Sequence, residues 1–156
     1  MKYTVRFAHL QESPKWKIGD KITRGNMIGI MGNTGQSTAA HLHIDCVVGE
    51  INKPFKLCDI GTRYAPDQKQ LDYFIDDELF GVKPVITTKF LDPEYKKTFG
   101  KDHPAYDVVP VDRHERNAHK NIYWNRSYIG TVSLIVNQPN GYGHCIYITF
   151  DSTKKE

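Results

Sequence analysis

The chain has 156 residues, of which 39% are apolar and 25% charged, and its 21 basic and 18 acidic side chains give a formal net charge of +3. This length and composition indicate one domain with a core of its own and exclude wholesale disorder. So small a basic surplus does not favour a nucleic-acid-binding protein, in which Lys and Arg are clustered. Apolar runs of only a few residues exclude a membrane-spanning segment, so we expect no membrane insertion.

The first third of the chain is expected to be β-structure. Residues 2–10 (KYTVRFAHL) alternate with a period of two, which places His9 on the same face as Val5 and Phe7. This start is strand-like and lacks a charged region followed by an apolar stretch, so we expect no signal peptide. Glycines then recur every few residues around short β runs such as 26–31, which is typical of tight turns in an all-β fold. Residues 41–48 (HLHIDCVV) predict another strand.

Residues 50–84 differ in texture and are expected to join two β regions. Pro54 and Pro66 interrupt the chain there. Apolar residues recur at helical spacing between residues 67 and 80, which predicts one short amphipathic helix with Asp67 as its N-cap.

The remainder of the chain returns to β character. Strands are predicted at residues 85–90, 128–136 and 144–150, with a turn at Asn140-Gly141 between the last two. Residues 112–127 are polar and predict a loop. The three cysteines, Cys46, Cys58 and Cys145, do not make a disulfide framework. We expect Cys46 and Cys145, both in predicted strands, to be buried apolar groups.

Two histidine motifs have the spacing of metal ligands. In His41-Leu42-His43, two imidazoles two residues apart point to the same face of a strand, as zinc ligands do. His103 and Asp107, four positions apart, can reach one cation from a turn that enters a strand. For each motif alone a structural interpretation is the more common one: two polar residues on a solvated strand face for the first, and a loop histidine with a capping aspartate for the second. His9, at the end of its strand, carries no signal by itself.

Taken together, these segments resemble the LytM/lysostaphin-type zinc endopeptidases (the M23 peptidases), which cut peptidoglycan peptides. YTVRFAHL and KIGDKITRGNMIGIMGNTGQSTAAHLHIDCV resemble the family's C-terminal half, in which a Y-x-H-L strand precedes a glycine-rich stretch ending in T-G-x-S-T-x-x-H-L-H. ITTKFLDPEYKKTFGKDHPAYDVV and YIGTVSLIVNQPNGYGHCIYITFD resemble its N-terminal half, which carries F-G-x-x-H-x-G-x-D and then G-Y-G-x-x-V-x-I-x-H. Here Ala105 replaces the usual Gly, and Pro104 is an unusual insertion.

The two halves stand in the reverse of the family order, so the chain looks like a circular permutant cut in a β-hairpin turn. On this interpretation one domain spans residues 1–156, with 1–49 equivalent to the family's C-terminal half, 50–84 as the joining segment, and 85–156 equivalent to its N-terminal half. A rival interpretation is that the chain holds the second half of one copy and the first half of another. We therefore expect a monomer, or a dimer in which two chains exchange halves.

The resemblance implies a mainly β fold of antiparallel sheets, of the duplicated hybrid-motif type, with a groove across the metal. It assigns one Zn²⁺ per chain to His103, Asp107 and His43, whereas spacing alone leaves open which of His41 and His43 is a ligand. It assigns His41 and His9 to the chemistry at the attacked carbonyl. His41 would take the proton of the attacking water, and His9 would donate a hydrogen bond to the oxyanion.

The expected function is that of a zinc metalloendopeptidase that hydrolyses peptide bonds in bacterial peptidoglycan stems or cross-bridges. We expect a phage-encoded lysin or virion component that acts at the host cell wall. The main alternative is a catalytically inactive binding or scaffold module of the same fold. KIGDKITRGNMIGIMG also resembles biotinyl and lipoyl carrier domains, but the chain lacks their modifiable-lysine tripeptide. The peptide bond that is cut and the native metal are left open.

Several other residues are weaker candidates. His114, His119 and His144 have no role that the resemblance assigns, and the first two are expected to be solvated loop residues. Five aromatic residues are candidates either for a peptide groove or for core packing: Tyr95, Tyr106, Tyr123, Trp124 and Tyr142.

Overall fold

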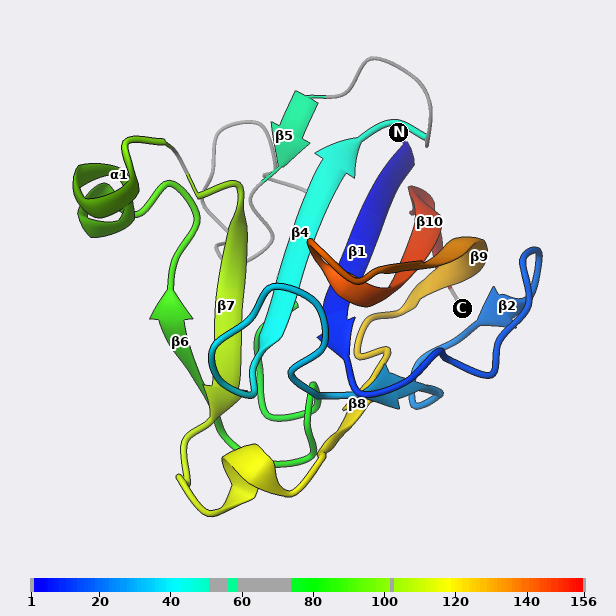
Figure 1. The fold of residues 1–156 in the computed structure, drawn as a ribbon. Coiled ribbons are helices and arrows are strands. Elements are labelled where there is room, and N and C mark those ends of the chain that lie inside the picture. The colour runs from blue at the N-terminus through cyan, green and yellow to red at the C-terminus, as the bar shows by residue number, and fades with distance from the viewer. Residues whose placement is uncertain (1, 51–55, 59–73, 102, 156) are drawn as a thin grey trace.

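The computed structural model describes residues 2–50, 56–58, 74–101 and 103–155 (Figure 1). Its strands are β1 (Lys2–Leu10), β2 (Lys21–Ile22), β3 (Met27–Ile30), β4 (Leu42–Val48), β5 (Lys56–Cys58), β6 (Pro84–Thr88), β7 (Ala105–Pro110), β8 (Asn121–Tyr123), β9 (Tyr128–Gln138) and β10 (Gly143–Lys155). Within the described residues there is one α-helix, α1 (Pro93–Phe99), and a short 3-10 helix at Glu115–Asn117. The prediction of a mainly β fold is confirmed.

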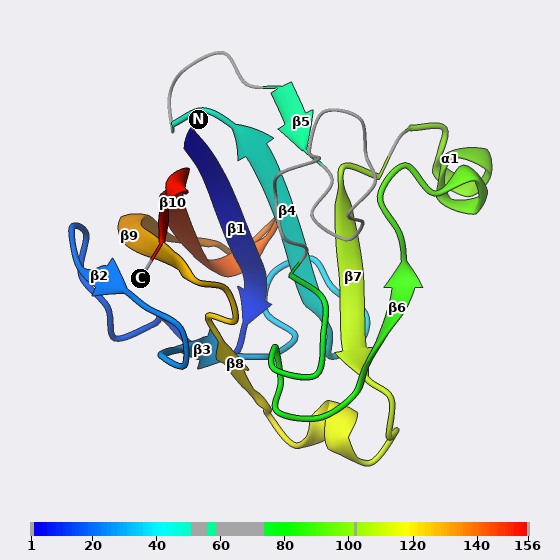
Figure 2. The same cartoon turned by 180° about the vertical axis from the view of Figure 1, so that it is seen from behind.

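Most strands belong to one antiparallel sheet with the order β2-β9-β10-β1-β4-β7-β6, and β5 pairs with β4. β3 and β8 form a separate two-stranded antiparallel sheet. Figure 2, which views the molecule from behind, shows β1, β4 and β7 side by side in the middle of the large sheet. The strands predicted at both ends of the chain are therefore neighbours, because β10 lies directly beside β1.

The register of β1, β4 and β7 sorts their side chains onto two faces. His43 lies opposite Ala8 on one side and Asp107 on the other, and Asp45 lies opposite Arg6. Since neighbours in register share a face, polar groups gather on one side of the sheet. The other side carries the apolar core, which includes Val5, Phe7, Leu42, Ile44, Cys46, Val108, Ile146 and Ile148.

A bulge interrupts β1 beside β10. Phe7 pairs with Ile146, but Leu10 pairs with His144, so β1 contains one residue more than its partner over this stretch. His9 lies in the bulge with a φ of 58°, in the left-handed region. Strict alternation would leave His9 on the core face with Phe7. The bulge instead turns its ring toward His41 and His43, so the predicted face of His9 was wrong for this physical reason.

The α-helix lies where the sequence did not predict one. Asp92 caps α1 by accepting a hydrogen bond from the Glu94 backbone N–H, and Gly100 ends it with a φ of 72°. Of the helix expected over residues 67–80, residues 67–73 lie outside the described part. Residues 74–80 form turns whose apolar side chains Phe74, Ile75, Leu79 and Phe80 are buried. The apolar residues at helical spacing are therefore the buried side chains of a turn, and their spacing did not indicate a helix.

The polar segment 112–127 is more structured than the loop prediction, since it contains the 3-10 helix and β8. Ile122 of β8 is buried, and Trp124 lies at the centre of an aromatic cluster with Phe74 and Phe150. Cys46 and Cys145 are buried thiols, as predicted. In the described part of the chain, no helix combines the length and the apolar character that crossing a membrane requires.

Candidate metal centre

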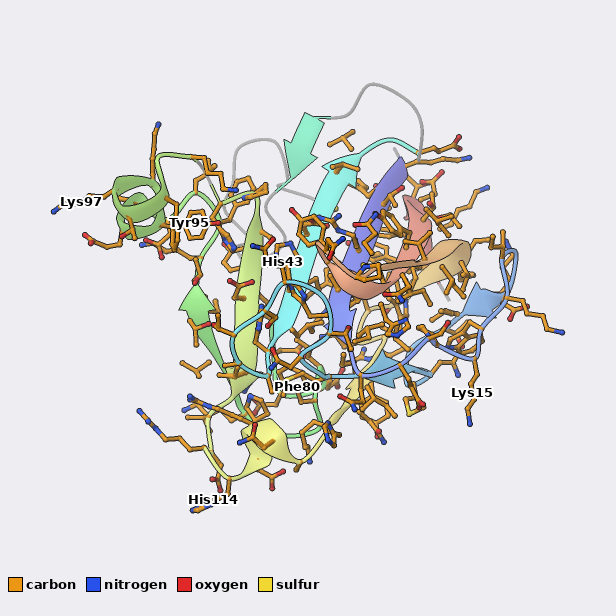
Figure 3. The ribbon with its side chains drawn as sticks, viewed as in Figure 1. Lys15, His43, Phe80, Tyr95, Lys97 and His114 are labelled. Carbon is orange, nitrogen blue, oxygen red and sulfur yellow. The ribbon has the colours of Figure 1, made fainter. Side chains whose placement is uncertain are left out.

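Three predicted ligands converge on the polar face of the sheet. His43 lies on β4, Asp107 lies opposite it on β7, and His103 comes from the loop that enters β7. His43 Nδ1 is 3.2 Å from Asp107 Oδ1, and His103 Nε2 is 3.2 Å from Asp107 Oδ2. One ligand atom from each residue lies within 4.8 Å of the others, and this is the only such group found among the described residues. Figure 3 shows His43 on this face, with Tyr95 of α1 to its side.

Hydrogen bonds outside the cluster select which ring nitrogens face it. His103 Nδ1 donates to the carbonyl oxygen of Lys89 at 3.3 Å, which leaves Nε2 directed at Asp107. His43 Nε2 lies 3.3 Å from Asp45 Oδ2, which leaves Nδ1 directed at Asp107. Outer partners of this kind orient histidine ligands in metal sites. Two neutral imidazole lone pairs and one carboxylate are a donor set that fits Zn²⁺ with an open position.

The charges of the cluster also fit a cation. Burial alone would raise the pKa of Asp107, but its hydrogen bonds with His103 and His43 outweigh burial and hold that pKa well below its usual range. Burial alone would lower the pKa of His43, but its hydrogen bonds with Asp107 and Asp45 outweigh burial and raise it. Without a metal, the two carboxylates therefore favour the protonated ring of His43. A divalent ion would replace that proton, as metal ions do at histidine sites.

His41 and His9 lie beside this cluster. His41 Nε2 is 3.6 Å from Asp107 Oδ1, while its Nδ1 lies 2.9 Å from the carbonyl oxygen of Ala39, to which it donates. The His9 ring centroid is 4.9 Å from that of His41 and 5.8 Å from that of His43. His9 Nδ1 donates to the carbonyl oxygen of Thr34 at 2.7 Å. All five residues singled out from the sequence therefore come together in one chain.

Because Nδ1 of His9 is occupied in that bond, its Nε2 is a lone-pair acceptor whenever the ring is neutral. Burial lowers the pKa of His9, and the neighbouring His41 and His43 lower it further, against the opposing hydrogen bond to Thr34. The neutral ring is thus the favoured form at neutral pH. Donation of a hydrogen bond to an oxyanion by His9, as the resemblance implies, requires the protonated ring.

The ligand cluster forms the floor of an open groove of about 860 Å³. One wall carries Tyr95 and Phe99 of α1, and the Tyr95 ring packs against His103 with centroids 4.6 Å apart. The loop 35–38 and Tyr142 also line the groove. Of the five aromatic candidates, Tyr95 and Tyr142 line this groove, whereas Tyr106 and Trp124 are buried in the core. His114 and His119 are exposed, as predicted.

Two charged residues of this centre were not among the residues predicted from the sequence. Arg6 and Asp45 form an ion pair whose side chains are 15% and 13% exposed. Asp45 follows His43 by two residues on the same strand, which was a usable signal that it shares the face of His43. Arg6 has no such signal, because only the register of β1 against β4 places it opposite Asp45.

Comparison with known proteins finds one family model and curated relatives that are similar to part of the chain. Residues 1–54 match the model of peptidase family M23. Peptidoglycan DD-endopeptidase ShyA of Vibrio cholerae is 44% identical over 46 residues, which cover 30% of this chain and 10% of that protein. Peptidoglycan DD-endopeptidase ShyC of the same organism is 30% identical over 73 residues, which cover 47% of this chain and 17% of that protein. No solved structure matches the chain.

The chain thus spans between a tenth and a fifth of the length of these curated relatives. The segment matched by the family model contains His9, His41 and His43 but ends well before His103 and Asp107. The N-terminal third of the chain is therefore similar in sequence to the M23 peptidases, and the other two candidate ligands are brought to it by the fold.

Proposed function

We propose that this chain is a zinc-dependent endopeptidase that hydrolyses peptide bonds in bacterial peptidoglycan. The observation that carries the proposal is the convergence of His43, His103 and Asp107, with His41 and His9 beside them, on the floor of one groove. The similarity of residues 1–54 to M23 peptidases supports the reaction class, and the two DD-endopeptidases support the substrate class.

His103 Nε2, His43 Nδ1 and a carboxylate oxygen of Asp107 would hold the ion. A bound zinc ion supplies Lewis-acid polarisation of the scissile carbonyl and activation of water at neutral pH. His41 presents the lone pair of Nε2 to the same space, because Nδ1 is held by Ala39, and we assign it the role of proton acceptor. Neutral His9 presents Nε2 in the same way, so we assign it as a second proton acceptor, whose protonated form would then face the oxyanion.

We also propose that the chain is circularly permuted relative to the family. β10 and β1 are antiparallel neighbours, with Asp151 opposite Lys2, so a short turn from the end of β10 to the start of β1 would make an ordinary hairpin. His43 and Asp107 are paired within one chain. Both observations support one permuted domain over exchanged halves.

The experiment that tests the proposed function measures zinc content and turnover of cross-linked muropeptides for the parent and for point variants. We expect about one zinc per parent chain, and loss of both zinc and turnover in H43A and D107A. H41A and H9A are expected to keep zinc but lose turnover by at least about 100-fold, the usual scale for a positioned acid or base. H114A, which replaces an exposed histidine, is the control and should match the parent.

Two outcomes would contradict the proposal. A parent chain that takes up no zinc from zinc-containing buffer would exclude the metal mechanism. A parent chain that binds zinc and muropeptides but releases no product would instead identify a binding or scaffold module.

A further inference from the structure

The ring of His43 is held from behind by two residues that belong to neither predicted motif. Its Nε2 lies 3.3 Å from Asp45 Oδ2, and both oxygens of Asp45 accept hydrogen bonds from Arg6, with Nε to Oδ1 at 3.1 Å. A guanidinium fork of this kind fixes the plane of a carboxylate as well as its charge. Arg6, Asp45 and His43 thus form a continuous chain of charge-assisted hydrogen bonds that ends at the candidate ligand.

Arg6 also contacts Tyr142, which lines the groove. Its guanidinium carbon lies 3.8 Å from the centroid of the Tyr142 ring, and the Tyr142 ring lies 5.0 Å from that of His43. Tyr142 sits in the turn between β9 and β10, and its carbonyl oxygen accepts a hydrogen bond from the His9 backbone N–H at 2.8 Å. The guanidinium of Arg6 therefore contacts both Asp45, which bonds to His43, and the ring of Tyr142, which packs against His43.

Burying the charges of Arg6 and Asp45 destabilises the fold unless each charge has a hydrogen-bonding partner. A buried ion pair often stabilises a fold no more than apolar residues of the same volume do. Its position on the polar face, one hydrogen bond behind a candidate ligand, favours a role in orienting that ligand.

We propose that Asp45 and Arg6 are positioning residues that hold His43 with Nδ1 toward the metal, Asp45 by accepting from Nε2 and Arg6 by fixing Asp45. The inference rests on the proposed zinc site and deepens it. Removal of an outer partner of a metal-bound histidine typically weakens metal binding about 10–100-fold. We expect that range for this pair, with no effect on the identity of the ligands.

The test compares two double variants that each replace a partly buried ion pair by apolar residues. R6M/D45L removes the pair behind His43. R126M/D76L removes the pair of Arg126 and Asp76, whose side chains are 14% and 29% exposed and which line no part of the groove. Zinc affinity is measured by competition with a chromophoric chelator, the absorption spectrum of the Co²⁺-loaded protein reports ligand geometry, and urea unfolding reports stability.

We expect R6M/D45L to bind zinc about 10–100-fold more weakly than the parent and to change the Co²⁺ spectrum. R126M/D76L should keep the zinc affinity and the Co²⁺ spectrum of the parent, even if its free energy of unfolding is lower. D45N, which keeps an oxygen able to accept from His43 Nε2, is expected to lose less affinity than R6M/D45L, and it carries the test if the double variant does not fold.

Equal zinc affinity and equal Co²⁺ spectra in the parent, R6M/D45L and D45N would overturn the inference and leave the proposed function standing. Equal losses in R6M/D45L and R126M/D76L would also overturn it, because they would reflect stability alone. A parent chain without zinc affinity would overturn the proposed function, and this inference with it.

Discussion

At the scale of single residues, His43 is defined by the two carboxylates on either side of its ring. Asp107 faces Nδ1 and Asp45 faces Nε2, at 3.2 and 3.3 Å. Because both contacts favour the charged ring, the pKa of His43 lies above its ordinary value despite burial. The same contacts hold the pKa values of Asp45 and Asp107 below their ordinary values. Proton and metal therefore compete for one place between these groups.

This competition predicts opposite pH dependences with and without zinc. A raised folded-state pKa means that His43 stabilises the zinc-free fold fully below its unfolded pKa of about 6.5, and that this contribution is lost as pH rises through the folded pKa. A difference of one in pKa corresponds to about 1.4 kcal/mol. Zinc-free protein should therefore lose stability as the pH rises above about 6.5, whereas the zinc-loaded protein should gain it, since zinc binds the neutral ring.

Urea unfolding from pH 4.5 to 9, with chelator or with zinc, checks this expectation. The zinc-free H43Q variant is the control, because it should show a smaller loss above pH 6.5 than the parent. A zinc-free parent whose free energy of unfolding rises over the same interval would contradict the assignment of the raised pKa.

At the scale of elements, the tip of the β9–β10 hairpin is hydrogen-bonded to the loop that precedes β4. Gln36 N donates to Gly141 O at 2.7 Å, and His144 N donates to Thr34 Oγ1 at 3.1 Å. Gly143 has a φ of 65°, and a Cβ at that residue would lie 2.3 Å from Thr34 Oγ1 and 2.5 Å from its backbone. This close approach sets the position of Tyr142, which lines the groove. It also sets the position of the Thr34 carbonyl oxygen, which accepts a hydrogen bond from His9.

Gly143→Ala is therefore expected to separate hairpin and loop. Left-handed backbone costs an L-residue about 1–2 kcal/mol, and overpacking adds about 1–3 kcal/mol. We expect a loss of about 2–5 kcal/mol in the free energy of unfolding, together with lower turnover because His9 and Tyr142 lose their fixed places. Gly141→Ala is the control in the same turn, since its Cβ would meet nothing closer than 3.8 Å. Equal stabilities of the two variants, measured by urea unfolding, would show that the contact is unimportant.

At the scale of the whole molecule, the candidate site depends on β4 meeting β7. His41 and His43 come from the N-terminal third and His103 and Asp107 from beyond residue 100, yet His43 and Asp107 are register partners within one chain. A long connection between them costs little extra free energy, because loop-closure entropy grows only slowly with length. A single chain is therefore sufficient to build one complete site.

A complementation experiment distinguishes this arrangement from exchanged halves. H43A and D107A chains are unfolded together, refolded as a mixture, and assayed for zinc content and turnover. We expect no recovery, since each chain closes its own defective site. Recovered activity would mean that His43 of one chain meets Asp107 of another. The mixture of H103A and D107A is the control, because both defects lie in the same half and neither arrangement restores a site.

The sequence alone determined the β class, the strands at both ends, the buried cysteines and the five histidine and aspartate candidates. These features follow from local rules, since period-two alternation and short motif spacing are written within a few neighbouring residues. The helical prediction for residues 74–80 was wrong because the spacing of apolar residues indicates burial but does not specify the backbone conformation. The helix α1 was not predicted because none of its residues is buried, so it has no apolar stripe.

Only the tertiary structure decided how these parts form a site. The bulge that turns His9 toward His41, the left-handed Gly143 that seats the hairpin tip, and the placement of Arg6 behind Asp45 all depend on the partner strand. Register is a pairing between residues distant in the chain, and a one-residue slip sends every side chain to the opposite face. A sequence states which side chains are present, whereas the pairing of β1, β4 and β7 decides which of them share a face.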